Sequence, residues 1–207
     1  MTDITYDFEF LENGITIKPI SIGMVTDKGD RYYAIFNDME TMNRAYTNKW
    51  LTDNVLSKLP LFMDYDGDLV WDMSHADYDK VKPAYEIADD VKHFIRNQTD
   101  PKLWAYYGAY DHVCYAQLYG TMMNLPAGFP MWTHEIMQEI EREQERNPHW
   151  TPKEQSGGLH NALEDAEWNM EVLREIEGLR RASAVIGAKA LPIPAYPLAH
   201  PGRVRVW

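Results

Sequence analysis

Thr5-Tyr6-Asp7-Phe8-Glu9-Phe10 is the stretch on which the predicted fold depends. It predicts a β-strand, and because the side chains of a strand alternate between its two faces, Asp7 and Glu9 share one face. Two carboxylates on one face of an otherwise apolar strand are unfavourable to bury unless a cation compensates them, and Mg²⁺ and Mn²⁺ prefer such oxygen ligands. The pair alone favours a simpler interpretation, an edge strand whose polar face meets water. Other parts of the chain have to decide between the two.

The composition is that of a globular protein with one substantial core. The chain has 207 residues, of which 45% are hydrophobic and 25% charged. It contains no apolar run of the roughly 18 residues that a membrane helix needs and no signal-peptide pattern, and its single cysteine, Cys114, favours a reducing compartment. We therefore expect a cytoplasmic protein without a membrane partner. The net charge of −12 argues against a broad nucleic-acid-binding face, but not against an enzyme that grips a few terminal nucleotides through metal ions.

Turn signals and side-chain periodicity predict an α/β protein that begins with an antiparallel meander. Strands are predicted over residues 4–10, 16–26, 31–36 and 103–107, with an irregularity at Pro19 in the second. Helices are predicted within residues 37–60 and 77–97, from Gly108-Ala109 onward, and over residues 133–146 and 159–182. In the first of these regions, the apolar residues Met42, Trp50 and Leu56 are predicted to be buried.

Three further segments carry weaker patterns. Residues 61–77 are rich in aspartate but lack the glycine and glutamate spacing of a calcium-binding loop, which predicts a turn or small hairpin. A brief strand is expected at Met131-Trp132. Residues 183–207 contain four prolines and no helical period, which predicts an arm or a disordered tail after a single domain over residues 1–182.

Polar residues in three separated stretches can supply one site. Asp7 and Glu9 lie on the first strand, Asp111 follows the strand at 103–107, and His160 and Asp165 stand near the start of the last helix. Two-metal phosphoryl chemistry needs several carboxylates around two ions roughly 4 Å apart, and a base for the attacking water. On a regular helix His160 and Asp165 would point roughly 140° apart. They converge only if His160 precedes the first regular turn, which Gly157-Gly158 would allow.

Each of these residues also has a simpler explanation when it is taken singly. Asp111 could be an acid that the helix dipole stabilises at a helix N-terminus. His160 could be an ordinary polar residue where a helix begins, and Asp165 an exposed acid on a helix surface. It is the ordered set that favours a metal site.

The ordered set resembles a known family. Asp-x-Glu, then Tyr-Asp after an apolar strand, then His-x-Ala-x-x-Asp is similar to the DEDDh 3′–5′ exonucleases of the RNase H-like fold, and looks most like the small RNase T-like exoribonucleases of actinobacteria. The similarity covers about residues 4–182 and is carried by Asp7-Phe8-Glu9-Phe10, Trp104-Ala105-Tyr106, Gly108-Ala109-Tyr110-Asp111-His112-Val113 and His160-Asn161-Ala162-Leu163-Glu164-Asp165-Ala166. It implies a mixed sheet of about five strands, three antiparallel and then parallel, with flanking helices.

The resemblance also implies roles for the site residues. Asp7, Glu9 and Asp165 would hold a first Mg²⁺ or Mn²⁺. Asp7 would bridge to a second ion, and Asp111 would act mainly through metal-bound water. His160 would take a proton from the water that attacks the terminal phosphodiester. The substrate would be the 3′ end of single-stranded RNA or DNA, from which nucleoside 5′-monophosphates would be released. The resemblance leaves open whether the protein forms a homodimer.

Phe8 and Tyr107 depart from the family pattern. Thr or Ser is usual at the position of Phe8, and many relatives carry Asn at the position of Tyr107. With Tyr110, these are the candidate substrate-contacting residues. Phe8 either stacks on the terminal base, worth roughly 1–3 kcal/mol, or packs in the core on the opposite face of the strand.

Two other functions are compatible with parts of the pattern. An inactive RNase H-like scaffold protein would have the same fold, but it would be expected to lack a catalytic acid, and none is missing here. A metal-dependent phosphohydrolase of small nucleotides would share the metal chemistry. Comparing hydrolysis of a free nucleotide with trimming of an oligomer distinguishes such a phosphohydrolase from an exonuclease.

Overall fold

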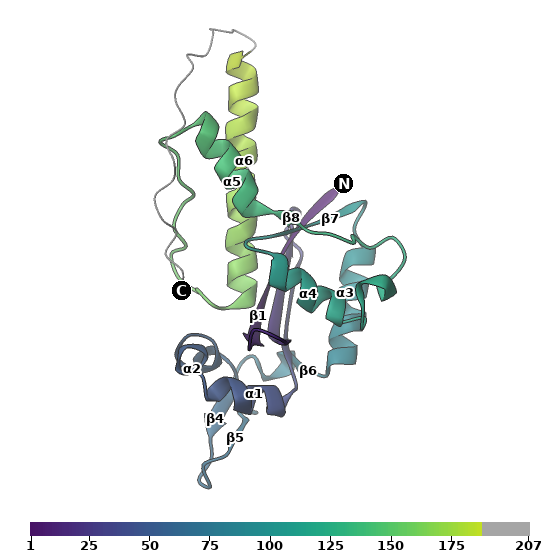
Figure 1. The fold of residues 1–207 in the computed structure, drawn as a ribbon, viewed down its shortest axis with the longest axis vertical. Coiled ribbons are helices and arrows are strands. Elements are labelled where there is room, and N and C mark those ends of the chain that lie inside the picture. The colour runs from purple at the N-terminus through teal and green to yellow at the C-terminus, as the bar shows by residue number, and fades with distance from the viewer. Residues whose placement is uncertain (188–207) are drawn as a thin grey trace.

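A mixed β-sheet forms the centre of the protein (Figure 1). The computed structural model describes residues 1–187, and within them the sheet has six strands in the order β6-β3-β2-β1-β7-β8. Their bounds are β1 (Thr2–Glu12), β2 (Ile17–Thr26), β3 (Arg31–Phe36), β6 (Val81–Lys82), β7 (Pro101–Ala105) and β8 (His134–Glu135). The first three strands are antiparallel, whereas β7 and β8 continue the sheet in parallel from β1. The predicted mixed α/β sheet is confirmed, with one strand more than expected.

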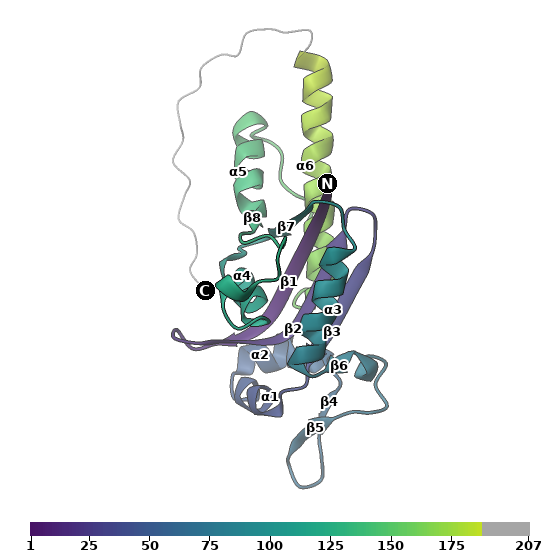
Figure 2. The ribbon, with the colours of Figure 1, turned by 90° about the vertical axis from the view of Figure 1, so that its right-hand side faces the viewer.

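Helices cover both faces of this sheet. They are α1 (Met39–Tyr46), α2 (Lys49–Asn54), α3 (Ala84–Arg96), α4 (Ala109–Gln117), α5 (Ile136–Arg146) and α6 (Ala162–Gly187), with short 3₁₀ turns η1 (Leu56–Lys58), η2 (Tyr78–Lys80) and η3 (Met122–Asn124). Figures 1 and 2 show α6 on one face of the sheet, and α3 and α4 on the other. Apolar side chains of β1 pack against α3 and α4, while α6 contacts β1 and β2. Within residues 1–187 no helix has both the length and the apolar character of a membrane span.

The structure corrects several predicted boundaries. The strand near residue 131 is wrong: Met131 and Trp132 are exposed, and β8 begins at His134, where pairing with β7 starts. Strand β7 ends at Ala105 rather than at residue 107, because Tyr107 has a left-handed backbone with φ of 55°. The last helix, predicted over residues 159–182, runs from Ala162 to Gly187. The rest of the proline-rich segment lies outside the described residues.

Two minor predictions are confirmed. Residues 61–77 contain a small hairpin of β4 (Leu61–Met63) and β5 (Leu69–Trp71). The register between β1 and β2 shifts beside Pro19, since Glu9 pairs with Ser21 but Phe10 pairs with Pro19. Proline has no N–H for a strand ladder, so a bulge at this position is expected.

Helix α6 approaches the sheet unusually closely at Gly23, which faces Asp7 across the β1–β2 pair. A Cβ built on Gly23 would stand 2.1 Å from the carbonyl oxygen of Ala162. The Thr5 hydroxyl fixes the next turn of the helix by donating a 2.7 Å hydrogen bond to the carbonyl of Ala166. The beginning of α6 is therefore held against the middle of β1.

We predict that Gly23→Ala destabilises the protein and lowers its activity. The added methyl would collide with backbone rather than with a flexible side chain, so helix and strand must separate. Overpacking of this kind typically lowers the free energy of unfolding by about 1–3 kcal/mol. Urea denaturation measures the change. Gly178→Ala on the exposed side of α6, where a Cβ meets nothing within 4 Å, is the control and should be neutral or stabilising. Equal stability of the Gly23→Ala variant and the wild type would contradict the prediction.

Candidate active site

The site lies where β1 and β7 separate. The parallel pairing of these strands runs only from Thr2–Pro101 to Thr5–Trp104. Beyond it, the backbone N–H of Phe8 donates a 2.8 Å hydrogen bond to Oδ1 of Asp111. The carboxylate of α4 thus takes the place of a neighbouring strand and stands beside the β1 acids.

Asp111 owes its position to the turn between β7 and α4. The two carboxylate oxygens of Glu135 accept hydrogen bonds from the N–H groups of Tyr107 and Gly108, both at 2.9 Å. Gly108 packs so tightly that a Cβ would come within 2.6 Å of the Cβ of Ala105. With the turn fixed in this way, Asp111 is buried in the first turn of α4 and directed at β1.

His160 and Asp165 converge because His160 precedes the regular helix. Its backbone is left-handed, with φ of 64°, and its N–H donates a 2.9 Å hydrogen bond to Oδ2 of Asp165. Gln155 donates a 2.7 Å hydrogen bond to the other oxygen, Oδ1. The local geometry that the five-residue spacing required is therefore present, and Gly158, with φ of 71°, provides the flexible approach.

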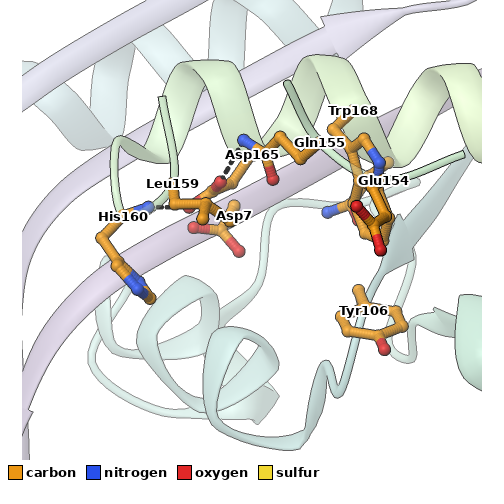
Figure 3. A pocket seen from close by; sticks show the side chains of 9 residues that line it. Asp7, Tyr106, Glu154, Gln155, Leu159, His160, Asp165 and Trp168 are labelled. Atoms are coloured by element: carbon orange, nitrogen blue, oxygen red, sulfur yellow. Dashed lines mark hydrogen bonds between the residues drawn. The ribbon is translucent and has the colours of Figure 1, made fainter. Parts of the chain in front are cut away.

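A cavity of about 460 Å³ joins these groups (Figure 3). Asp7, His160 and Asp165 line one part of it, and Tyr106 and Trp168 line another. Figure 3 shows Asp7 next to Asp165, with the imidazole of His160 and the ring of Tyr106 at opposite ends. The three potential ligand groups of Glu9, His160 and Asp165 have atoms within 4.8 Å of one another.

Burial is the main reason why the pKa values of the four acids are raised. Burial is the largest cause of the raised pKa of Asp7, and among the neighbouring charges Asp111 contributes most. Burial likewise raises the pKa of Glu9 to about 8, with Asp165 as the strongest neighbouring charge. The pKa of Asp111 rises to about 7 by burial, against the hydrogen bond from Phe8, and burial also raises the pKa of Asp165. Buried acids with raised pKa values create an electrostatic cost that a bound cation would offset.

The three candidate substrate-contacting residues differ in exposure: Phe8 is buried, whereas Tyr107 and Tyr110 are exposed. Phe8 is 3% exposed and packs edge-on against Tyr6 at 6.2 Å, on the sheet face that α3 and α4 cover. Its side chain cannot stack on a base, so the core alternative is the correct one. Tyr107 and Tyr110 are 62% and 53% exposed, and Tyr110 lies 5.6 Å from the ring of Phe10.

Sequence reasoning missed two residues that contact the loop before α6. Trp50, predicted to be buried, is 51% exposed and its ring lies 4.7 Å from the imidazole of His160. Lys58 donates a hydrogen bond to the carbonyl of Leu159. Neither belongs to a motif, and Lys58 is separated from Leu159 by 101 positions, so no local spacing could have identified them.

The raised pKa of Glu9 predicts how stability depends on pH. Between its ordinary value of 4.5 and its folded value of about 8, the folded state holds a proton that the unfolded state has released. The free energy of unfolding contributed by Glu9 therefore falls as pH rises through this window. In metal-free buffer, Glu9→Gln should melt at a higher temperature than the wild type, and the difference should be larger at about pH 8 than at about pH 5.

Thermal denaturation of both proteins at the two pH values tests this prediction. Glu12→Gln, which changes an exposed acid on the same strand, is the control. A difference between Glu9→Gln and the wild type that stays constant with pH would contradict it.

Comparison with known proteins identifies the family. Residues 2–177 match the family described as the 3'-5' exoribonuclease Rv2179c-like domain. Two Mycobacterium tuberculosis proteins, 3'-5' exoribonuclease Rv2179c of strain H37Rv and 3'-5' exoribonuclease MT2234.1 of strain CDC 1551, are each 36% identical to this chain over 174 residues. The matched region is 83% of this chain and 90% of each relative. The predicted resemblance to small actinobacterial exoribonucleases is confirmed, and the chain belongs to the family of 3'-5' exoribonuclease Rv2179c-like domains.

Proposed function

We propose that this protein is a divalent-metal-dependent 3′–5′ exoribonuclease that releases nucleoside 5′-monophosphates from single-stranded ends. The observation that carries the proposal is that Asp7, His160 and Asp165 line one cavity, with Glu9 close to His160 and Asp165 and with Asp111 hydrogen-bonded to the strand that carries Asp7 and Glu9. Membership of the Rv2179c-like family supports the exoribonuclease assignment.

The donor set suits two Mg²⁺ or Mn²⁺ ions. Carboxylate oxygens are the ligands these ions prefer, and a bound cation would offset the burial and the neighbouring acids that raise the pKa of Asp7 and Glu9. We propose that the pair Glu9 and Asp165, together with Asp7, holds one ion. Asp7 and Asp111 would hold the second. When bound, such ions offset the carboxylate charge and stabilise negative charge that develops on a phosphate.

His160 is the proposed general base. Burial lowers its pKa, so the imidazole is neutral near pH 7 and can accept a proton. The hydrogen bond from its own N–H to Asp165 fixes the backbone, which leaves the ring directed at the cavity (Figure 3). In this position it takes a proton from the water that attacks the terminal phosphodiester.

The proposed substrate is a strand end rather than a duplex. A volume of about 460 Å³ is that of a small-ligand pocket, which suits one terminal nucleotide. Tyr107 and Tyr110 flank the start of α4, where Asp111 lies, and each exposed ring could stack on a base for roughly 1–3 kcal/mol. These two contacts would hold the strand without requiring a basic surface.

Asp7→Asn should abolish trimming of single-stranded RNA. The substitution removes the carboxylate charge that both proposed ions share, but it keeps the side-chain volume, and it also removes a destabilising charge. The variant should therefore remain folded, with a melting temperature in metal-free buffer equal to or above that of the wild type.

The measurement is digestion of 5′-labelled single-stranded RNA and matched DNA with Mg²⁺, with product lengths resolved over time. Glu12→Gln on the same strand serves as the active control. Full activity of Asp7→Asn would refute the proposed site. Hydrolysis of free nucleotides without trimming of the oligomer would refute the exonuclease and favour a small-nucleotide phosphohydrolase.

His160→Ala should lower turnover by about 10²–10⁴-fold while sparing metal binding, because a positioned base contributes that range. Turnover is measured with saturating oligonucleotide, and Mn²⁺ binding by calorimetry. Unchanged turnover would remove His160 from the role of base. A large loss of Mn²⁺ affinity would instead make it a metal ligand, as its closeness to Glu9 and Asp165 allows.

A further inference from the structure

The loop that carries His160 has a strained conformation. Gly158 and His160 both have left-handed backbones, with φ of 71° and 64°, on either side of Leu159. A left-handed histidine is uncommon, and such strain persists only where surrounding contacts hold it. The hydrogen bond to Asp165 is one such contact, but it comes from the helix that follows the loop directly. A contact from a distant element would hold the loop more firmly, because it fixes the loop relative to the sheet.

The segment of residues 48–58, which contains α2 and η1, supplies that contact at two points. Lys58 donates a hydrogen bond to the carbonyl of Leu159, immediately before His160. The ring of Trp50 meets the imidazole of His160 edge to face, with centroids 4.7 Å apart and planes at 73°. One contact fixes the backbone of the loop and the other limits the ring to a narrow range of orientations.

The segment is itself rigidly anchored. Its residues Leu51, Val55 and Leu56 are buried in a cluster with Ile20 and Ile35 of the sheet. Asn48 caps α2, since its side-chain oxygen accepts hydrogen bonds from the N–H groups of the next turn. Both contacts therefore fix the position of the loop relative to the sheet that carries the β1 carboxylates.

We propose that Lys58 and Trp50 are positioning residues that clamp the loop, so that the imidazole of His160 stays over the acidic site. This inference rests on the proposed exonuclease function, in which His160 is the base.

The alternative is that Trp50 and Lys58 contact the substrate directly. An exposed tryptophan can stack on a base and a lysine can bind a phosphate. Such contacts contribute to binding in the ground state, so their loss raises KM more than it lowers kcat. A clamp controls the orientation of His160, so its loss lowers kcat. Its loss also makes the loop more mobile in the absence of substrate.

Lys58→Met tests the first contact. Methionine keeps an unbranched apolar stem but removes the donor to Leu159. We expect kcat to fall by about ten- to a hundredfold, the range that misplacement of a reacting group produces, with KM within about threefold. Hydrogen–deuterium exchange of residues 156–162 should become faster in the same variant. Lys58→Arg, which keeps a cationic donor, should recover most of the lost kcat, and Lys49→Met, which changes an exposed lysine on the same segment, should match the wild type in both measurements.

Trp50→Phe and Trp50→Ala test the second contact. Phenylalanine can still meet the imidazole, so it should preserve kcat, whereas alanine should lower it by about tenfold or more. Phe62→Ala, which removes another half-exposed aromatic side chain, is the control and should leave both constants unchanged.

Two outcomes would overturn the clamp. One is an unchanged kcat and unchanged loop exchange in Lys58→Met. The other is an effect of Lys58→Met and Trp50→Ala that is confined to KM, which would make both residues substrate contacts. The clamp and the proposed function are tested separately, because the activity of Asp7→Asn decides the proposed function. If Asp7→Asn stays active, the exchange measurement still shows whether Lys58 holds the loop.

Discussion

The contact between the start of α6 and the middle of the sheet is the constraint on which the active site depends. Gly23 has no side chain, so the carbonyl of Ala162 lies where a Cβ would stand, and the Thr5 hydroxyl fixes the next turn of the helix. Because Gly23 is the partner of Asp7 in the strand pair, the packing of helix on sheet also sets how close Asp165 comes to the β1 acids. Stability and site geometry cannot be changed separately here.

Without a bound cation, this arrangement of buried acids destabilises the folded chain. Asp111 and Glu9 are almost fully buried, and burial raises the pKa of all four acids, with repulsion from neighbouring acids adding to the shift at Asp7, Glu9 and Asp111. The large apolar cluster that β1 forms with α3 and α4 offsets this repulsion on the other face of the same strand. A cation that binds between the acids would relieve the repulsion, so that the energy stored in crowding would contribute to metal affinity. The side chain of Phe8 is part of this apolar cluster, and its burial there makes it unavailable to substrate.

The sequence was sufficient to predict the parts of the site that local rules determine. The period of two in β1 placed Asp7 and Glu9 together, and the turn residues delimited the antiparallel meander. It could not predict Glu135, whose carboxylate holds the β7–α4 turn through contacts 27 and 28 positions away, or the loop contacts of Lys58. Such contacts have no spacing rule, because they arise only when separate elements are packed. Trp50 shows the converse error, in which a residue predicted to be buried is half exposed and contacts the ring of His160 instead of the core.

The charge of the chain constrains how it can meet RNA. A net charge of −12 repels a polyanion at long range, so affinity has to come from a few short contacts. On the proposed function these are the ions held by the carboxylates and the exposed rings of Tyr107 and Tyr110, which flank the start of α4, where Asp111 lies. Contacts gathered at one point can hold the end of a strand, because only the last nucleotides have to reach them. The interior of a strand would bring additional phosphates against the acidic surface with no compensating contact, so this arrangement favours removal of nucleotides from an end over internal cleavage.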